Sequence, residues 1–267
     1  MTTTAPIPAP VWQPAIARFR RWLPAVVVFV VVLMLWEVLV GAFKIQRFLL
    51  PAPSLIWETF WRVLPDLITA TGYTAGNALG GLLLGAALGV IVALATARWT
   101  IINEGLMPFA IAVNAMPIIA LAPILNQWFG LQNPLSKISV VALLVFFPVM
   151  INMVRGLTQV SAASLELMRS YAATDFTILR QLRLPNALPF LFAALKVGSS
   201  LSVIAAVVSE YFGGTQRALG QFISQRAGLF NFPEAWAGIV VACLLGLSLY
   251  GIVVVLERVA MPWRREE

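Results

Sequence analysis

The sequence contains no histidine and only one cysteine, and each shortage excludes some chemistry. Without histidine the chain lacks the commonest general base and the commonest transition-metal ligand. The single cysteine, Cys243, cannot form a disulfide within the chain, and its position in an apolar run indicates packing. No Gly-Lys dipeptide occurs, so a phosphate-binding loop of the G-x4-G-K-[ST] type is excluded. We therefore expect no catalytic residues and no metal site.

Charged residues are also scarce. They make up 11% of the chain, against about 25% in soluble domains, while 60% of the residues are hydrophobic and the mean hydropathy is +0.90. Several uncharged stretches exceed the roughly 20 residues that a helix needs to cross a bilayer. The net charge of +7 does not indicate nucleic-acid binding, because the basic residues lie at the ends of apolar runs. The composition predicts an all-α integral membrane protein.

About six apolar runs are long enough to span the membrane, and together they predict one transmembrane domain over residues 24–257. Tails are expected over residues 1–23 and 258–267. Within residues 44–66, the sequence SLIWETFWRVL predicts an amphipathic helix at the membrane surface, anchored by Trp57 and Trp61. The expected spans are 24–43, 67–97, 105–125, 138–154, 187–208 and 235–256.

Basic residues predict the orientation of these spans. Six spans place both termini on one side, together with the polar stretch 155–186. That side has eleven Lys and Arg residues and the other side six, with Lys196 inside a span, for the total of 18. Because cytoplasmic loops carry the excess of Lys and Arg, we expect both termini and the polar stretch to be cytoplasmic.

Glycines recur at intervals of four in the second expected span. One series is Gly72, Gly76 and Gly80, and a second follows at positions 81, 85 and 89. Small residues at this spacing let another helix approach closely. The pattern predicts helix packing without identifying the partner helix.

The longest polar interruption is ELMRSYAATDFTILRQLRLPNALP at residues 166–189. Leu165, Met168 and Ala172 have helical spacing, whereas Pro185 and Pro189 are expected to end the helix. A short amphipathic helix outside the membrane can be bound by another protein. The alternative is an ordinary amphipathic helix that rests on the lipid surface.

This stretch resembles the cytoplasmic loop of ABC importer permeases, whose pattern is E-A-A-x3-G-x9-I-x-L-P. Glu166 begins the pattern, Ala172 stands at the glycine position, Leu182 at the isoleucine position, and Leu184-Pro185 closes it without a gap. The departures are Leu167 and Met168 for the two alanines and Ala172 for glycine. Further segments resemble the branch that imports nitrate, sulfonates, taurine and pyrimidine-type vitamin precursors, over roughly residues 30–257: LLPAPS, PIIALAPILNQWFG, FFPVMIN and ALPFLFAALKVG.

The resemblance implies a type I permease fold in the bacterial inner membrane, with a second copy of the chain completing the pore. It implies two ATP-hydrolysing subunits, which carry the ATP and Mg, and an extracytoplasmic binding protein that delivers the solute. This chain would bind no cofactor itself. The loop would form a coupling helix that contacts the ATPase, through Glu166, Met168, Arg169, Tyr171, Ala172, Ala173, Leu184 and Pro185.

Polar residues in or near the spans are candidates for a translocation path: Asn77, Asn114, Lys196 and the helix-bending Pro117. The simpler interpretation is hydrogen bonding between helices, and for Lys196 a pairing with an acid such as Glu37. Glu210, expected just outside the fifth span, is a candidate for a gate or for docking of the binding protein.

Two other functions are compatible with a helical membrane protein. An ion-gradient-driven secondary transporter or channel would carry inverted repeats and relay residues, and a membrane-embedded enzyme would carry a catalytic cluster. Neither feature is evident. For the importer, a thiamine-pyrimidine or riboflavin-like heterocycle is the favoured solute, with sulfonate, taurine and nitrate as alternatives.

Overall fold

The computed structural model describes residues 13–98, 105, 108, 110, 112–113, 116–214 and 217–263, and all regular structure in these residues is helical. Within the described residues, five helices are long and apolar enough to cross a membrane, which confirms the all-α membrane class. They correspond to five of the expected spans: α1 (Gln13–Ala42), α3 (Leu64–Arg98), α6 (Pro134–Thr158), α9 (Leu184–Tyr211) and α11 (Phe232–Ala260).

The expected span at 105–125 is described only in part, because residues 106, 107, 109, 111, 114 and 115 lie outside the described residues. Its described end forms a 3-10 turn, η1 (Ile118–Leu121), followed by the short apolar helix α5 (Ala122–Phe129). After α5 the chain turns at Gly130, whose φ of +93° favours glycine, and Asn133 then caps α6 by accepting a hydrogen bond from the Leu135 amide.

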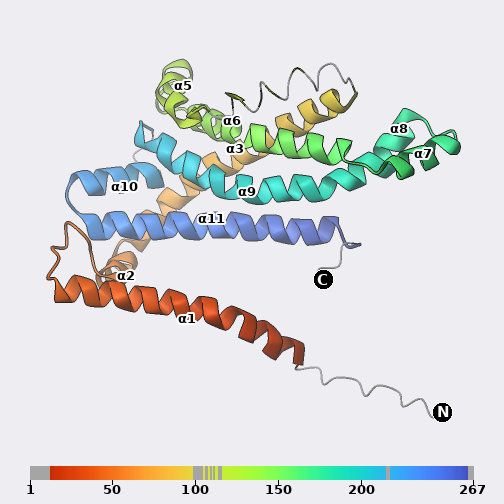
Figure 1. Ribbon diagram of the computed structural model, residues 1–267. Coiled ribbons are helices and arrows are strands. Elements are labelled where there is room, and N and C mark those ends of the chain that lie inside the picture. Colours follow the sequence, from red (N-terminus) through yellow and green to blue (C-terminus); the bar gives the residue numbers. More distant parts are fainter. Residues whose placement is uncertain are drawn as a thin grey trace, which may run out of the picture.

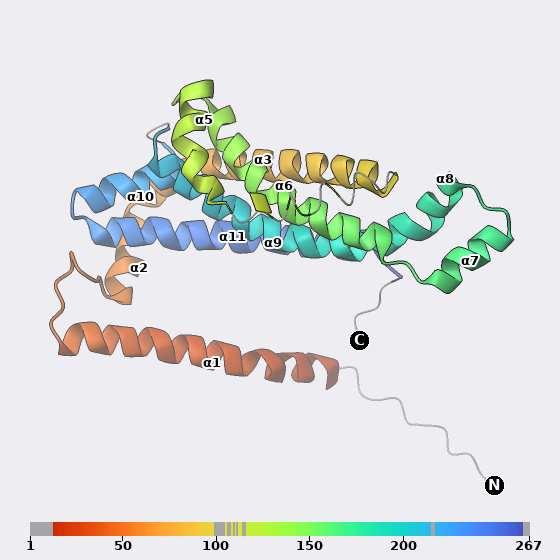
Figure 2. The ribbon, with the colours of Figure 1, turned by 45° about the horizontal axis from the view of Figure 1, so that its top comes forward.

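The spanning helices form a bundle in which α3, α6 and α9 are the most deeply buried (Figure 1). Helix α11 packs on α9, and α1 lies apart from the bundle in both ribbon views (Figure 2). The C-terminal part of α1 contacts α11 and α2. The Trp36 ring meets the Trp236 ring of α11 edge to face, with 5.1 Å between the ring centroids. Glu37 binds Ser54 in α2 (Pro53–Arg62).

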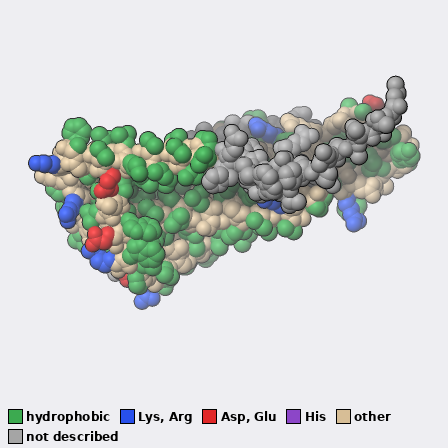
Figure 3. Space-filling model, turned by 90° about the horizontal axis from the view of Figure 1, so that it is seen from below, with side chains coloured by type: hydrophobic (Ala, Val, Ile, Leu, Met, Phe, Trp, Pro, Cys, Tyr) green, Lys and Arg blue, Asp and Glu red, His purple; other side chains and the backbone are tan. Residues whose placement is uncertain are grey.

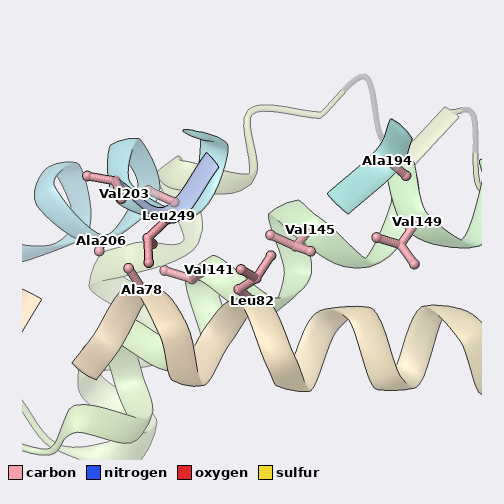
Figure 4. Packing of buried hydrophobic residues seen from close by; sticks show 10 residues of the cluster. Ala78, Leu82, Val141, Val145, Val149, Ala194, Val203, Ala206 and Leu249 are labelled. Atoms are coloured by element: carbon pink, nitrogen blue, oxygen red, sulfur yellow. The ribbon is translucent and has the colours of Figure 1, made fainter. Parts of the chain in front are cut away.

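The centre of the bundle is an apolar cluster in which Ala78 and Leu82 of α3 face Val141 and Val145 of α6 (Figure 4). Glycine allows this close approach. A Cβ atom on Gly85 would lie 2.4 Å from the Ala142 carbonyl oxygen. The second predicted glycine series, at positions 81, 85 and 89, therefore packs against α6. A Cβ atom on Gly72 or Gly76, in the first series, would have no neighbouring atom within 4 Å.

The short helices lie at the two ends of the bundle. Helices α7 (Ala162–Ser170) and α8 (Asp175–Ile178) extend beyond one end, while α2, α5 and α10 (Leu219–Gly228) lie at the other (Figure 2). On the face seen in Figure 3, hydrophobic side chains cover much of the length, and many charged side chains gather at the end where α2 and α10 lie.

Two helices extend past the expected limits of the transmembrane domain. Helix α1 begins at Gln13 and continues through Pro24, so the expected tail 1–23 includes a helical part; proline is tolerated in membrane helices. Helix α11 continues to Ala260, beyond the expected end of the domain at residue 257.

The expectation that Pro185 and Pro189 end the cytoplasmic helix is also wrong. The chain stays helical from α8 into α9 through a π-helical turn, Leu179–Arg183, and Pro185 lies in the first turn of α9. A proline ring clashes with the carbonyl four residues earlier, here Gln181, and the wider π-turn relieves such a clash.

Candidate functional site

The segment between α6 and α9 is a helical hairpin built by local capping. The Ser161 hydroxyl accepts the Ser164 amide at the start of α7, and the Thr174 hydroxyl accepts the Thr177 amide at the start of α8. Between the two helices Ala172 adopts a left-handed conformation with φ of +53°. Ala172 stands at the glycine position of the importer pattern, and the geometry explains why glycine suits that position.

Large apolar side chains are exposed on this polar hairpin. Leu167, Tyr171 and Phe176 are 58%, 78% and 70% exposed, respectively. The hairpin projects beyond the bundle, so these side chains do not contribute to its core (Figure 2). Exposed apolar groups on a polar projection are typical of a surface that another protein covers.

The predicted coupling residues lie on the hairpin and at its return to the bundle. Glu166, Arg169, Tyr171, Ala172 and Pro185 are exposed, whereas Met168, Ala173 and Leu184 are half-buried. Sequence reasoning missed Phe176; an aromatic residue within a charged loop was the available signal.

Asn186, in the first turn of α9, closes the base of the hairpin, and the sequence analysis also missed it. Its side-chain amide donates to the Gly156 carbonyl at 2.7 Å and to the Gln159 carbonyl at 3.1 Å. Both acceptors belong to the last turn and C-cap of α6. Helices α6 and α9 are in close contact there, because a Cβ atom on Gly156 would lie 2.6 Å from the Ala187 Cα.

Lys196 forms an ion pair within the bundle. Its Nζ lies 2.8 Å from Glu257 Oε2, which joins the middle of α9 to the last turns of α11. The suggested partner Glu37 is wrong: its carboxylate instead accepts the Ser54 amide at 3.0 Å and hydroxyl at 2.7 Å. Glu37 therefore supports the N-terminus of α2, where the helix dipole favours an anion.

Asn77 and Glu210, which were predicted for different roles, are hydrogen-bonded to each other. Asn77 Nδ2 donates to Glu210 Oε1 at 2.9 Å, and the Thr74 hydroxyl donates to Oε2 at 2.9 Å. Glu210 does not lie outside the fifth span: it is in the last turn of α9 and only 1% exposed. A carboxylate buried in this way cannot contact a binding protein directly in this conformation.

The other two candidates for the translocation path, Pro117 and Asn114, make no described contact with Asn77 or Lys196. Pro117 precedes the 3-10 turn η1, and Asn114 lies outside the described residues.

Comparison with known proteins identifies the chain. Residues 81–260 match the binding-protein-dependent transport system inner membrane component family. The chain belongs to this family. The matched residues include both the hairpin and Glu210, and the membership makes the chain a permease subunit of an ABC importer and a multi-pass inner membrane protein.

Two curated relatives have nearly the same length as this permease. It is 32% identical over 239 residues to the riboflavin transport system permease protein RibX of Chloroflexus aurantiacus. The alignment covers 89% of this chain and 88% of RibX. It is 30% identical over 243 residues to the formylaminopyrimidine transport permease protein ThiX of Halalkalibacterium halodurans. That alignment covers 90% of this chain and 95% of ThiX.

A solved structure supports the type I permease fold. A chain of an amino acid ABC transporter, crystallised with histidines, superposes with a TM-score of 0.61 at 16% identity. The superposition covers 75% of this permease and 96% of that chain. At this identity the likeness concerns the fold alone.

Proposed function

We propose that this permease pairs with a second copy of itself and is driven by two separate ATP-hydrolysing subunits. The α7–α8 hairpin is the coupling element that each ATPase subunit binds. ATP and Mg are bound by the ATPase subunits and not by the permease. Closure of the ATPase pair moves the two hairpins together and switches the pore between its inward-open and outward-open states. Both termini and the hairpin are cytoplasmic in this arrangement.

The observation that carries the proposal is the exposure of Leu167, Tyr171 and Phe176 on a hairpin rigidly joined to α9. Buried aromatic anchors supply most of the binding energy in protein interfaces, and the hairpin offers two. The continuous helix from α8 into α9 gives a rigid connection from this surface to the centre of the bundle.

For the solute we propose a small polar heterocycle, of the riboflavin or formylaminopyrimidine type, delivered by an extracytoplasmic binding protein. Support comes from the names of RibX and ThiX, the two relatives above that are at least 30% identical. A relative named for aliphatic sulfonates, SsuC of Bacillus subtilis, is 26% identical over 245 residues. Sulfonates are therefore the second class to test.

The test is co-purification of the full-length permease with a co-expressed ATPase subunit. We expect Tyr171→Ala with Phe176→Ala to weaken the association about 30-fold or more, as the loss of at least about 2 kcal/mol from a central anchor implies. Trp128→Ala is the matched control, because Trp128 is 74% exposed at the opposite end of the bundle.

The solute is tested on the same complex in proteoliposomes. A loaded binding protein should stimulate ATP hydrolysis, and riboflavin, formylaminopyrimidine and an alkyl sulfonate are compared as its cargo. Failure of the wild-type permease to bind any ATPase would refute the coupling proposal. Stimulation by the sulfonate alone would refute the heterocycle.

A further inference from the structure

Two oppositely charged side chains, Glu210 and Lys137, are buried at the end of the bundle that carries α5 and α10. They are 1% and 3% exposed. Burying a charge is costly unless it is hydrogen-bonded, and ionisable groups within membrane proteins commonly mark functional elements. The contacts of each charge show which parts of the chain they hold together.

Glu210 holds the beginning of α10. Its Oε2 atom accepts the Gly220 amide at 2.9 Å, and Thr74, which donates to the same carboxylate, accepts the Leu219 amide at 2.9 Å. The first amides of a helix have no partner within it, and here α3 and α9 supply the missing acceptors. Gln221 adds a side-chain bond to the Glu210 carbonyl at 2.7 Å.

The fit around Gly220 is tight. A Cβ atom there would lie 2.2 Å from the Val207 carbonyl oxygen and 2.6 Å from the Glu210 Cβ. Helix α10 therefore lies directly against α9 at its first turn, and the contact is closed by hydrogen bonds to one carboxylate.

Lys137 holds α5 in a similar way. Its Nζ donates to the Asn126 side-chain oxygen at 3.0 Å and to the Leu131 carbonyl. The Asn126 amide group in turn donates to the Phe212 carbonyl, directly after α9, at 3.2 Å.

We propose that this network is a clasp that closes the extracytoplasmic end of the permease and opens during transport. Glu210 keeps α10 against α3 and α9, and Lys137 keeps α5 against the end of α9. This inference rests on the proposed orientation and function, which put this end on the side of the binding protein. Hydrogen bonds suit a contact that opens near water, because water replaces the lost partners and the net cost of opening is small.

The experiment measures the accessibility of α10 in the two states of the transporter. A full complex carries Cys243→Ser, which removes the exposed native thiol, and Ala218→Cys, which places a thiol at a residue that is 2% exposed beside the clasp. Labelling by a membrane-impermeant maleimide is followed at rest and with ATP bound to a hydrolysis-deficient ATPase. Leu229→Cys, at the exposed end of α10, is the control.

We expect the thiol at position 218 to react roughly tenfold faster in the ATP-bound state, as a shift between two populations predicts, while position 229 reacts equally in both. Adding Glu210→Gln should raise the resting rate at 218 toward the ATP-bound rate, because a neutral amide cannot accept all three hydrogen bonds. Equal labelling at 218 in both states would show a permanent structural contact and overturn the clasp.

ATPase association and hydrolysis are measured in the same samples. A complex that assembles and hydrolyses ATP while position 218 stays protected refutes only the clasp. If no ATPase assembles, the proposed function fails, and the clasp is judged by the effect of Glu210→Gln on the permease alone, where an unchanged labelling rate overturns it.

Discussion

Lys196 in the middle of α9 and Glu257 near the end of α11 are joined by an ion pair of 2.8 Å. The pair links the helix that continues from the hairpin to the helix that ends the permease domain. Both side chains are less than one third exposed, at 26% and 18%. Removing either partner therefore leaves the other with a poorly solvated charge.

We expect Lys196→Met or Glu257→Gln alone to lower the stability of the purified permease by about 1–3 kcal/mol, less than for a fully buried pair. The double variant should recover most of that loss, because neither charge is then left unpaired. Thermal unfolding in detergent measures the stability of the wild type, the two single variants and the double variant. Transport by the stable double variant decides the predicted path role: full transport would show that Lys196 is structural, and lost transport would support a place in the path.

The left-handed conformation of Ala172 predicts that glycine is better at this position. An alanine in this region costs roughly 1–2 kcal/mol, so Ala172→Gly should stabilise the hairpin by about 1 kcal/mol after the entropy of glycine is counted. Slower hydrogen exchange of the α7 amides is the expected readout. Ala163→Gly, in the first turn of α7, is the control and should not slow exchange, since glycine has a lower helix propensity than alanine and no left-handed residue is relieved there. Faster exchange in Ala172→Gly would contradict the prediction.

Length and hydropathy predicted five of the spanning helices well, because a bilayer requires long apolar runs. A short helix outside the membrane was predicted from the helical spacing of Leu165, Met168 and Ala172, but the second helix of the hairpin and the continuous helix through Pro185 were not. A π-turn that accommodates a proline depends on the surrounding packing and leaves no clear pattern in the sequence.

The contacts between distant residues could not be predicted. Asn77 was recognised as a polar group within a span and Glu210 was expected just outside one, so the two residues, 133 positions apart, received separate roles. Thr74 gave no signal at all, since threonine is common in membrane helices and often bonds its own helix. Lys137 was one of the six basic residues assigned to the side opposite the termini, because it lies at the start of an apolar run, where a lysine ordinarily reaches water.

The close contact between α3 and α6 predicts different effects for two glycines of α3. Gly85→Val should destabilise the permease by about 1–3 kcal/mol or prevent folding, because the new side chain would overlap the Ala142 backbone. Gly76→Val is the matched control, with no atom within 4 Å, and should change stability by less than about 0.5 kcal/mol. Thermal unfolding and yield of folded protein are compared. An equal loss at Gly76 would show that another surface covers this face of α3.

Asn186 joins the start of α9 to the end of α6 at the base of the hairpin, and we expect it to be needed for coupling rather than for ATPase binding. Asn186→Ala removes two hydrogen bonds to the end of α6, worth about 1 kcal/mol each, and leaves Tyr171 and Phe176 in place. The variant should bind the ATPase as the wild type does but move less solute for each ATP hydrolysed, because movement of the hairpin is passed on to α6 less completely. Both rates are measured in proteoliposomes.

The control for this prediction is Asn152→Ala, which removes a side-chain bond made within α6 to the Pro148 carbonyl at 2.8 Å. It should keep the ratio of solute moved to ATP hydrolysed, since no contact between helices is lost. If Asn186→Ala kept the ratio as well, the connection through the α8–α9 helix alone would suffice to transmit the movement. If it lost ATPase binding instead, Asn186 would act by holding the hairpin in the conformation that the ATPase binds.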